Sequence, residues 1–434
     1  MGPVEVALIL FGIFAALIIL RVPVAFALGL SCVPVFFIDD RLTPFLLLNE
    51  MLKSYNSFLL LAIPFFMLAA NLMNSAGITE KLINLSRALV GHLPGGLGHV
   101  SVLVSMLFAG ISGSSTAEAA GVGGVLIPAM KKQGYDTSFT VALVACAAVM
   151  GVIIPPSILM VVWGGVISVS IGGLFVAGVL PGVLMGLSLM GAVYIYARRR
   201  SYPVYKRVSL PELVSVCAAA VLPILTPGII VGGIVFGFFT PTEASVVAVL
   251  YAMLLGVIIY STLDLMQLRQ TLYDSARFAS IALFCIGTAS AFGWILAYFH
   301  IPQLVVTAVS NMGGGVTSVG FITAAAFLFI GCFIDAIPAI IIVGTILAPL
   351  AAKVGMHPIH FAIIGVISIA YGLVTPPYGL CLMIACSIGG IKIKDALKDT
   401  AILFIPMLFV LLIVILFPDL ILWLPRRLMP ALVK

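Results

Sequence analysis

Charged residues are scarce in this chain of 434 residues. Asp, Glu, Lys and Arg together make up 8% of it, whereas hydrophobic residues make up 63%. Soluble globular chains carry about 25% charged residues. The shortage of charge therefore excludes an ordinary soluble domain and predicts an all-α polytopic membrane protein. The net charge of +6 falls in short loops, where it indicates orientation in the membrane and not nucleic-acid binding.

The sequence also lacks the motifs of metal, redox and ATP chemistry. Its seven cysteines stand singly in apolar segments, with no C-x-x-C pair, and its five histidines fall near segment ends. No phosphate-cradling G-x-x-x-x-G-K-[ST] loop is present. These absences predict a protein without a cofactor, one that does not hydrolyse ATP itself.

Long apolar runs are plentiful. A run of about 20 residues can span the roughly 30 Å hydrocarbon layer. The first run, Val4–Leu20, lacks the basic start of a signal peptide, so we expect it to be a spanning helix. The candidate spans are 4–20, 22–38, 57–74, 138–170, 174–197, 213–235, 240–260, 278–299, 358–390 and 400–424.

Two regions have a different pattern. The run Gly98–Met130 is interrupted at Ile111–Thr116, which leaves arms of about 14 residues that reach about 21 Å. Because such arms are too short to cross, we predict a re-entrant hairpin with its tip inside the membrane. Val316–Lys353 predicts a matching hairpin, with its tip near Asp335–Pro338.

The pattern of helix-breaking residues is repeated without a gap. Gly110 pairs with Gly331 and Pro155-Pro156 with Pro376-Pro377, each at an offset of 221 residues (331 − 110 and 376 − 155). Proline in mid-segment predicts that 138–170 and 358–390 are each two half-helices joined by an unwound loop. Broken segments at corresponding places in two halves indicate a transporter's binding site.

Loop charge predicts how the repeats face the membrane. With the basic loop 198–207 in the cytoplasm, the two hairpins enter from opposite faces, so the repeat is inverted, and both termini lie in the periplasm. Four basic residues then lie outside, against the positive-inside rule: Lys353, Arg426, Arg427 and Lys434. Segments 42–54, 79–91 and 261–277 mix charge with helical periodicity and are expected to be interfacial helices, with ordinary loops as the alternative.

Three acidic residues do not sit at ordinary segment ends: Glu118, Asp335 and Glu243. An ionisable residue inside a bilayer is costly, so each is a candidate functional group. Glu118 and Asp335 lie at or just past the hairpin tips, where sealing the tip by hydrogen bonds is the structural alternative. Glu243 follows Thr240-Pro241-Thr242, and helix capping explains it equally well.

The first hairpin tip is dense in small oxygen-bearing groups. Hydroxyl and unwound carbonyl oxygens suit a hard cation such as Na⁺, and neighbouring half-helix N-termini suit an anion. The opposing Pro-Pro loops would add further oxygens. The candidate residues are Ser112, Gly113, Ser114, Ser115, Thr116, Pro155, Pro156, Ser157, Thr375, Pro376 and Pro377. In the second repeat Asp335 occupies the position that corresponds to Ser114 (335 − 114 = 221), so two ion sites at the tips would differ.

The chain resembles the large membrane subunit of the tripartite ATP-independent periplasmic (TRAP) transporters. The resemblance lies in the runs Gly110–Ala120 and Leu126–Asp136, in Phe239–Ala244 and in Thr375–Pro377, and it covers essentially the whole chain. Glu118 stands where many members carry Asp. By motif, Ser112, Ser115, Asp335 and Ala336 are carried over as sodium or substrate ligands, and Thr242 and Glu243 belong to the matching Thr-Pro-Thr-Glu run.

The resemblance implies a Na⁺-driven importer of a small organic acid, such as a C4-dicarboxylate, keto acid or sugar acid, in the bacterial inner membrane. It implies an elevator mechanism, with a small membrane subunit and a periplasmic substrate-binding protein as partners. The implied division is a scaffold at 1–97, 174–315 and 391–434 and a transport domain at 98–173 and 316–390.

Three other functions stay open on the sequence alone. A sodium–dicarboxylate carrier of the same architecture would work without a binding protein. An intramembrane enzyme could use Glu118 and Asp335 as an acid/base pair, although no His or Cys nucleophile constellation supports this. A membrane scaffold without transport activity would not need the buried carboxyl groups.

Overall fold

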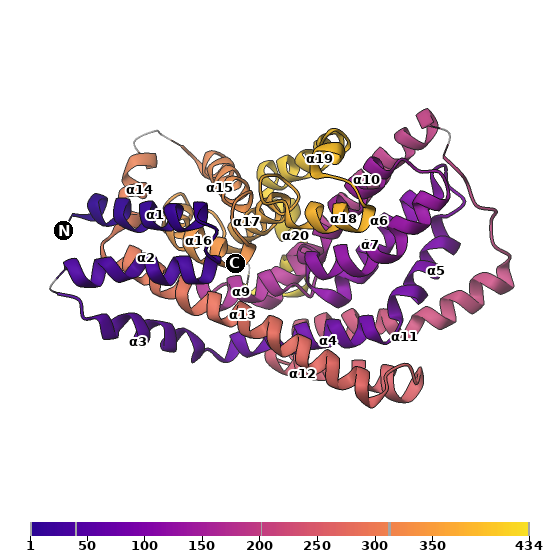
Figure 1. The fold of residues 1–434 in the computed structure, drawn as a ribbon, viewed down its shortest axis with the longest axis horizontal. Coiled ribbons are helices and arrows are strands. Elements are labelled where there is room, and N and C mark those ends of the chain that lie inside the picture. The colour runs from indigo at the N-terminus through magenta and orange to yellow at the C-terminus, as the bar shows by residue number, and fades with distance from the viewer. Residues whose placement is uncertain (1, 40, 201, 311–313, 433–434) are drawn as a thin grey trace.

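The fold, given by a computed structural model that describes residues 2–39, 41–200, 202–310 and 314–432, is built from helices (Figure 1). Within these ranges there are twenty α-helices and no strand. The first half comprises α1 Pro3–Ile19, α2 Val24–Ile38, α3 Pro44–Tyr55, α4 Ala62–Ser75, α5 Ile78–Val90, α6 Gly96–Ser112, α7 Ser115–Lys132, α8 Thr137–Ala148, α9 Ile158–Ile167 and α10 Ile171–Arg200. The all-helical prediction is confirmed.

The second half follows after an extended linker. It comprises α11 Leu210–Val235, α12 Pro241–Met253, α13 Leu265–Tyr298, α14 Ile301–Ser310, α15 Val316–Gly331, α16 Ala336–Lys353, α17 Pro358–Gly372, α18 Leu380–Gly389, α19 Ile393–Leu416 and α20 Pro418–Leu428. The π-helical turn Leu254–Ile259 continues α12, and short 3-10 turns lie at Phe58–Leu61, Val149–Val152 and Pro430–Leu432.

The repeat extends well beyond the glycines and prolines that revealed it. The bounds of α7 and α16 differ by 221 at both ends (336 − 115 and 353 − 132). The same offset carries α3 onto residues 265–276 of α13, and α5 onto residues 299–311, which contain α14. The sequence-based interpretation did not expect a helix at α14, although the repeat itself required one there.

Both hairpins and both broken helices are confirmed. Helices α6 and α7 pack against each other, as do α15 and α16. Segment 138–170 divides into α8 and α9, and segment 358–390 into α17 and α18, with the Pro155-Pro156 and Pro376-Pro377 peptides cis in the two breaks. Proline cannot donate to the helix ladder and clashes with the preceding turn, so both helices end before it.

The predicted length of the hairpin arms was wrong. The arms are 17 and 18 residues in the first hairpin and 16 and 18 in the second. An 18-residue arm reaches about 27 Å, so the argument that the arms are too short to cross does not hold for α7 or for α16. The apolar run is shorter than helix α7, because the helix continues through the charged residues Lys131 and Lys132 at its end.

Segment 261–277 is not a separate interfacial helix, as the sequence had suggested. Its residues 265–277 form the first part of α13, a continuous helix of 34 residues capped by Asp264. No proline or glycine occurs between Leu265 and Ile286, so the helix has no reason to stop where its hydropathy changes. In the first repeat the chain does break, at Asn56–Leu61, between α3 and α4.

The predicted span 400–424 is also wrong in its bounds. Helix α19 begins at Ile393, where Asp395 caps the backbone of Lys392, and ends at Leu416. Pro418 then starts α20, a separate amphipathic helix, because proline is favoured in the first turn of a helix and not in its interior. The expected helices over 42–54 and 79–91 are present as α3 and α5.

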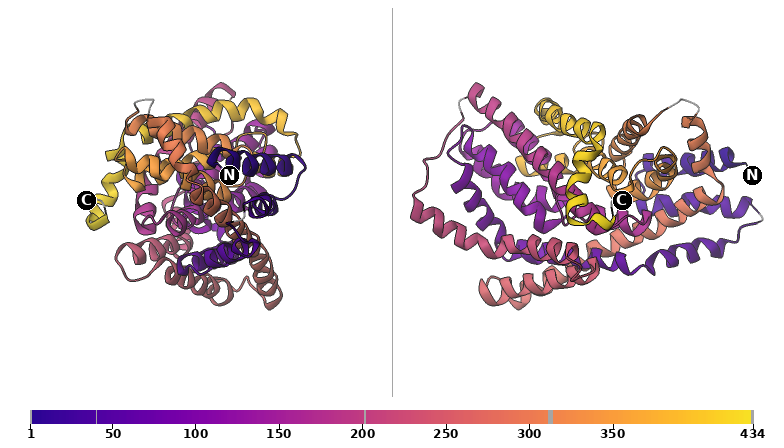
Figure 2. Two further views of the ribbon diagram at one scale, coloured as in Figure 1. Left: turned by 90° about the vertical axis from the view of Figure 1, so that its left-hand side faces the viewer. Right: turned by 180° about the vertical axis from the view of Figure 1, so that it is seen from behind.

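The two repeats interlock at the centre of the molecule. Helix α18 packs on α7, and α9 packs on α16, so each broken helix rests on the hairpin of the other repeat. Helices α3, α4, α12 and α13 form a row along the lower edge in Figure 1, and the hairpins lie above it. Figure 2 shows the same row from behind.

Seven helical segments among the described residues are long and apolar enough to cross a membrane, judged by length and composition. They are Phe58–Ser75, Ile171–Arg200, Leu210–Val235, Pro241–Ile259, Leu265–Tyr298, Ala336–Lys353 and Ile393–Leu416. Helices α1 and α2, expected to span, have 17 and 15 residues. Lys434, which entered the charge argument, lies outside the described residues.

Candidate ion and substrate site

The tip of the first hairpin is a tight turn made of small residues. Helix α6 ends at Ser112 because Gly113 adopts a left-handed conformation, φ 62°, that suits glycine. Helix α7 then begins with Ser114 as its cap, and the Ser114 hydroxyl accepts from the Ala117 amide at 3.4 Å. A second contact joins the Ser114 and Thr116 hydroxyls at 3.1 Å. Small polar residues therefore turn the chain and leave oxygens at the tip.

This tip is hydrogen-bonded to the loop of its own broken helix. The Ile158 amide donates to the Gly113 carbonyl at 3.2 Å. A Cβ atom at Gly113 would lie 2.8 Å from the Pro156 carbonyl oxygen, so only glycine allows this approach. Ser157 caps α9: its hydroxyl donates to the Val152 carbonyl at 2.7 Å and accepts from the Met160 amide at 3.3 Å. The structure thus brings residues 112–116 and 155–157 together.

The second tip repeats the arrangement with different chemistry. The Tyr378 amide donates to the Cys332 carbonyl at 2.9 Å. The carboxylate of Asp335 accepts from the Ala336 amide at 2.7 Å at the start of α16. The Thr375 hydroxyl donates to the Tyr371 carbonyl at 2.9 Å, at the end of α17. A carboxylate therefore stands where the first tip has a serine.

Glu118 is fully buried on α7. Its carboxyl group makes no hydrogen bond to residues 112–116 of the tip, and the polar side chain beside it is that of Ser105 on α6. Gly151, at the end of the α8 segment, lies against it: a Cβ at position 151 would be 2.6 Å from Glu118 Oε2. A buried carboxyl group is costly, and because this one makes no bond to the tip, sealing of the tip does not explain it.

Thr242 and Glu243 lie in different surroundings from the tips. The Glu243 carboxylate accepts from the Thr240 amide and hydroxyl, both at 2.8 Å, which forms a capping box at the start of α12. The Thr242 hydroxyl donates to the Phe58 carbonyl at 2.8 Å. The capping interpretation is therefore what the structure shows. Their assignment to an ion site stays a prediction.

A cavity of about 460 Å³ opens beside the first tip. Its wall includes Ser112, Ser114 and Thr116 of the hairpin and Asn71 and Asn74 of α4. The first three were candidate residues. The two asparagines were missed, because only acidic residues were considered within the spans. Their spacing of three residues on one face of an apolar segment was the available signal.

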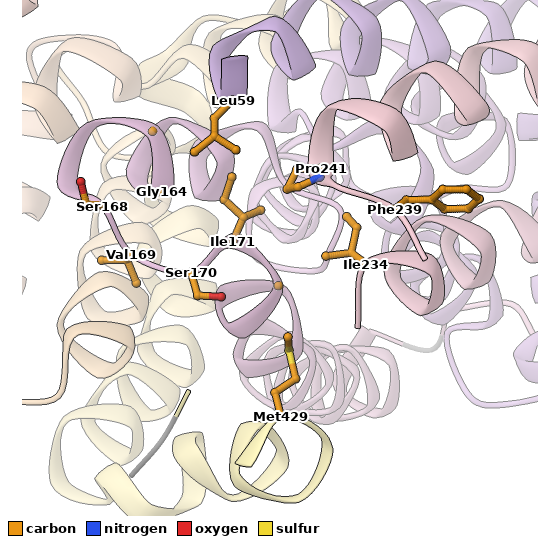
Figure 3. Close-up of a pocket in the computed structure, with 12 residues that line it drawn as sticks. Leu59, Gly164, Ser168, Val169, Ser170, Ile171, Ile234, Phe239, Pro241 and Met429 are labelled. Carbon is orange, nitrogen blue, oxygen red and sulfur yellow. The ribbon is translucent and has the colours of Figure 1, made fainter. Parts of the chain in front are cut away.

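A larger cavity, of about 640 Å³, lies elsewhere. It borders the connection between α9 and α10, where Ser168 has a positive φ of 59°. Figure 3 shows Leu59, Ile171 and Ile234 around it, with Met429 reaching in from near the C-terminus. No candidate ion or substrate residue lines this cavity, so the candidate site is the smaller one.

No group of three or more His, Cys, Asp or Glu side chains comes together in the part of the chain that the structure describes. A cation at either tip would instead be held by hydroxyl and carbonyl oxygens, with at most one carboxylate. Such oxygen ligands suit a hard cation.

Comparisons with known proteins give one family. The family model described as "Tripartite ATP-independent periplasmic transporter, DctM component" matches residues 11–420. The sialic acid TRAP transporter large permease protein SiaM of Vibrio cholerae is 36% identical over 378 residues, 87% of this chain and 88% of its own. The C4-dicarboxylate TRAP transporter large permease protein DctM of Pseudomonas aeruginosa is also 36% identical, over 84% of each chain.

A solved structure supports the fold. The YdaH transporter of Alcanivorax borkumensis matches with a TM-score of 0.53, over 81% of this chain and 84% of its own, at 13% sequence identity. At that identity the likeness concerns architecture alone.

Proposed function

The chain belongs to the DctM family of tripartite ATP-independent periplasmic transporters, and on that premise we propose that it imports a small organic anion driven by a Na⁺ gradient. It is a transporter permease subunit and not an enzyme, and it works with a small membrane subunit and a periplasmic binding protein. The anion is of the carboxylate class, because the two relatives above are named for sialic acid and for C4-dicarboxylates.

The observation that carries the proposal is the pair of tip-to-loop hydrogen bonds. Ile158 to Gly113 in one repeat and Tyr378 to Cys332 in the other join each hairpin tip to its own broken helix. Such contacts gather unwound carbonyls, hydroxyls and half-helix N-termini at two points. These are the groups that transporters use for coupling ions and anionic substrates.

We assign one Na⁺ site to each tip. The first would use oxygens from residues 112–116 and 155–157, with Glu118 close behind. The second would use Asp335, the Ala336 backbone, Thr375 and the carbonyls at Pro376 and Pro377. Na⁺ binding would order the tips and complete the anion site, so that each ligand strengthens binding of the other.

The moving unit comprises the two repeats at 98–173 and 316–390. We extend it to α10 and α19, which the sequence-based division placed in the scaffold. Helix α10 packs on α6 and α17, and α19 packs on α8 and α17, which supports movement together. Helices α4, α12 and α13 would then stay fixed, with both termini on the periplasmic side of the inner membrane.

The test is uptake into proteoliposomes that contain the complete three-component transporter. Radiolabelled organic acids are supplied with the binding protein, under an inward Na⁺ gradient, a matched K⁺ gradient or a proton gradient. Uptake only with Na⁺ and only with the binding protein supports the proposal.

Other outcomes contradict defined parts of it. Uptake driven by protons and indifferent to Na⁺ overturns the ion assignment. Uptake without the binding protein supports a sodium–dicarboxylate carrier of the independent type. No uptake of any acid overturns the transport proposal.

A further inference from the structure

The cavity beside the first tip is lined by residues of both the proposed moving unit and the proposed scaffold. On one side stand the hydroxyls of Ser112, the last residue of α6, and of Ser114 and Thr116 at the N-terminus of α7. On the other side stand Asn71 and Asn74 of α4, in the proposed scaffold. A substrate in the cavity would therefore touch the moving unit with one end and the scaffold with the other.

The amide of Asn71 is held in one orientation. Its Nδ2 donates to the Ser275 hydroxyl at 2.8 Å, and that hydroxyl already donates to the Thr271 carbonyl at 2.7 Å. Ser275 can therefore only accept from Asn71, which fixes the amide nitrogen towards α13. The remaining group, Oδ1, makes no hydrogen bond among the described residues and is an acceptor available to a ligand.

Asn74 offers the complementary group. Its Oδ1 accepts from the Thr79 hydroxyl at 3.0 Å and lies close to the backbone of α7, since a Cβ at Gly121 would be 3.2 Å from it. Its Nδ2 makes no hydrogen bond within the described structure. The pair therefore presents one free acceptor and one free donor, from positions three apart on the same helix face.

The two asparagines are not a packing requirement of the repeat. At the offset of 221, position 71 corresponds to Phe292 and position 74 to Ile295, and both of these side chains are fully buried and apolar. The second repeat thus packs a hydrophobic surface where the first opens a polar cavity. Only one of the two copies is built to meet a polar ligand.

One free donor and one free acceptor match a hydroxyl group, which can satisfy both. A carboxylate only accepts, so beside Asn71 Oδ1 it would face another acceptor. No Arg or Lys lines the cavity in the described structure, so a carboxylate at the asparagine end would have no cation to offset its desolvation. At the other end, the hydroxyls and helix N-terminus at the tip favour a carboxylate.

We propose that Asn71 and Asn74 determine substrate specificity, and that the cavity takes a hydroxylated monocarboxylate of the sugar-acid class in preference to a dicarboxylate. This inference rests on the proposed function, because it takes the cavity as the substrate site. It assigns the carboxylate to the hairpin tip and a hydroxyl to the asparagine pair.

The test measures binding to the purified complex of the two membrane subunits, in Na⁺ buffer, without the binding protein that selects substrates on its own. The probes are D-gluconate, a hydroxylated monocarboxylate, and succinate, a dicarboxylate, measured by titration calorimetry. D-gluconate is expected to bind about tenfold more tightly, the equivalent of about 1.4 kcal/mol.

Variants separate a role in specificity from a role in folding. Asn71→Leu and Asn74→Leu are each expected to weaken D-gluconate binding about tenfold, as for one lost hydrogen bond, and to leave succinate within twofold. Asn84→Leu is the matched control, at an exposed asparagine on α5 whose side chain hydrogen-bonds only to Arg87 among the described residues. Asn71→Ser and Asn74→Ser repeat the measurement if a leucine variant does not fold.

Equal affinity for the two probes overturns the inference, as do variants that weaken both probes alike. In those cases binding of a carboxylate leaves the proposed function standing. Binding of neither probe also overturns the inference, and the uptake experiment then decides separately on the proposed function.

Discussion

Gly151 faces the carboxyl group of Glu118 with no room for a side chain between them. A Cβ atom at position 151 would lie 2.6 Å from Glu118 Oε2 and 3.0 Å from the Ser114 carbonyl oxygen. The second repeat makes an equivalent contact, where a Cβ at Gly372 would lie 2.6 Å from the backbone of Gly331. In both repeats a glycine near the break lets the hairpin tip close against the broken helix.

Gly151→Ala is therefore expected to displace the first tip. Overpacking a tight site costs about 1–3 kcal/mol, and here the added methyl meets a backbone carbonyl that cannot rotate away. We expect Na⁺-dependent uptake to fall at least tenfold, while the purified protein still assembles with the small membrane subunit. Uptake and assembly are measured on the same preparation.

The matched control is Gly124→Ala on α7, where a Cβ meets no atom within 4 Å. It removes a flexible glycine from a helix interior, so uptake should be unchanged and stability slightly raised. Wild-type uptake by Gly151→Ala would contradict the close fit of tip and broken helix.

Lys131 joins the ends of two interlocked helices. Its ammonium group donates to the Gly389 carbonyl at 2.8 Å, at the C-terminus of α18, where a positive charge also favours the helix dipole. Lys131→Met should loosen the last turn of α18, because one such contact contributes about 1 kcal/mol. Hydrogen–deuterium exchange over residues 386–391 should be about fivefold faster.

The adjacent Lys132 supplies a control for that prediction. Lys132→Met removes a charge from the same helix end, and no hydrogen bond of Lys132 occurs in the described structure. Exchange in α18 should not change with it. If both variants accelerate exchange equally, the effect comes from net charge and not from the contact with Gly389.

Asp136 should contribute to stability in a pH-dependent way. The pKa of Asp136 is lowered mainly by a hydrogen bond from the Tyr202 hydroxyl and also by the Arg200 guanidinium. Both groups donate to its Oδ2 at 2.6 Å. A carboxyl group whose pKa is lower in the folded state stabilises the fold when the pH is above the pKa of the unfolded state, about 3.9. That stabilisation is lost as the pH falls through the pKa of the folded state. The effect is modest because the Asp136 side chain is about half exposed, at 52%.

Asp136→Asn should therefore lower the unfolding temperature at pH 7 and flatten its decline between about pH 5 and pH 2. The measurement is a thermal-unfolding series across that range in detergent. Glu80→Gln, at an exposed carboxylate on α5, should leave the profile parallel to wild type. If the unfolding temperature of Asp136→Asn falls with pH as steeply as that of the wild type, Arg200 and Tyr202 do not act through this carboxylate.

The sequence located the breaks more reliably than the helix ends. Glycine and proline act locally, so the two hairpins and the two Pro-Pro breaks followed from single residues. The extent of α13 did not follow, because its hydropathy changes near residue 277, where the chain has no proline or glycine to end the helix. Asn71 and Asn74 were missed because only acidic residues were considered within the spans, and the orientation of Asn71 depends on Ser275, which lies 204 residues away in the sequence.

The central claim is that two different tips each bind Na⁺ and act together. The most direct measurement is the rate of organic-acid uptake as a function of Na⁺ concentration, in proteoliposomes that contain the complete transporter at fixed membrane potential. Two coupled sites predict a sigmoidal dependence with a Hill coefficient between 1 and 2, reduced to about 1 in Asp335→Asn. Uptake that does not depend on Na⁺, or a hyperbolic dependence that Asp335→Asn leaves unchanged, would contradict the account.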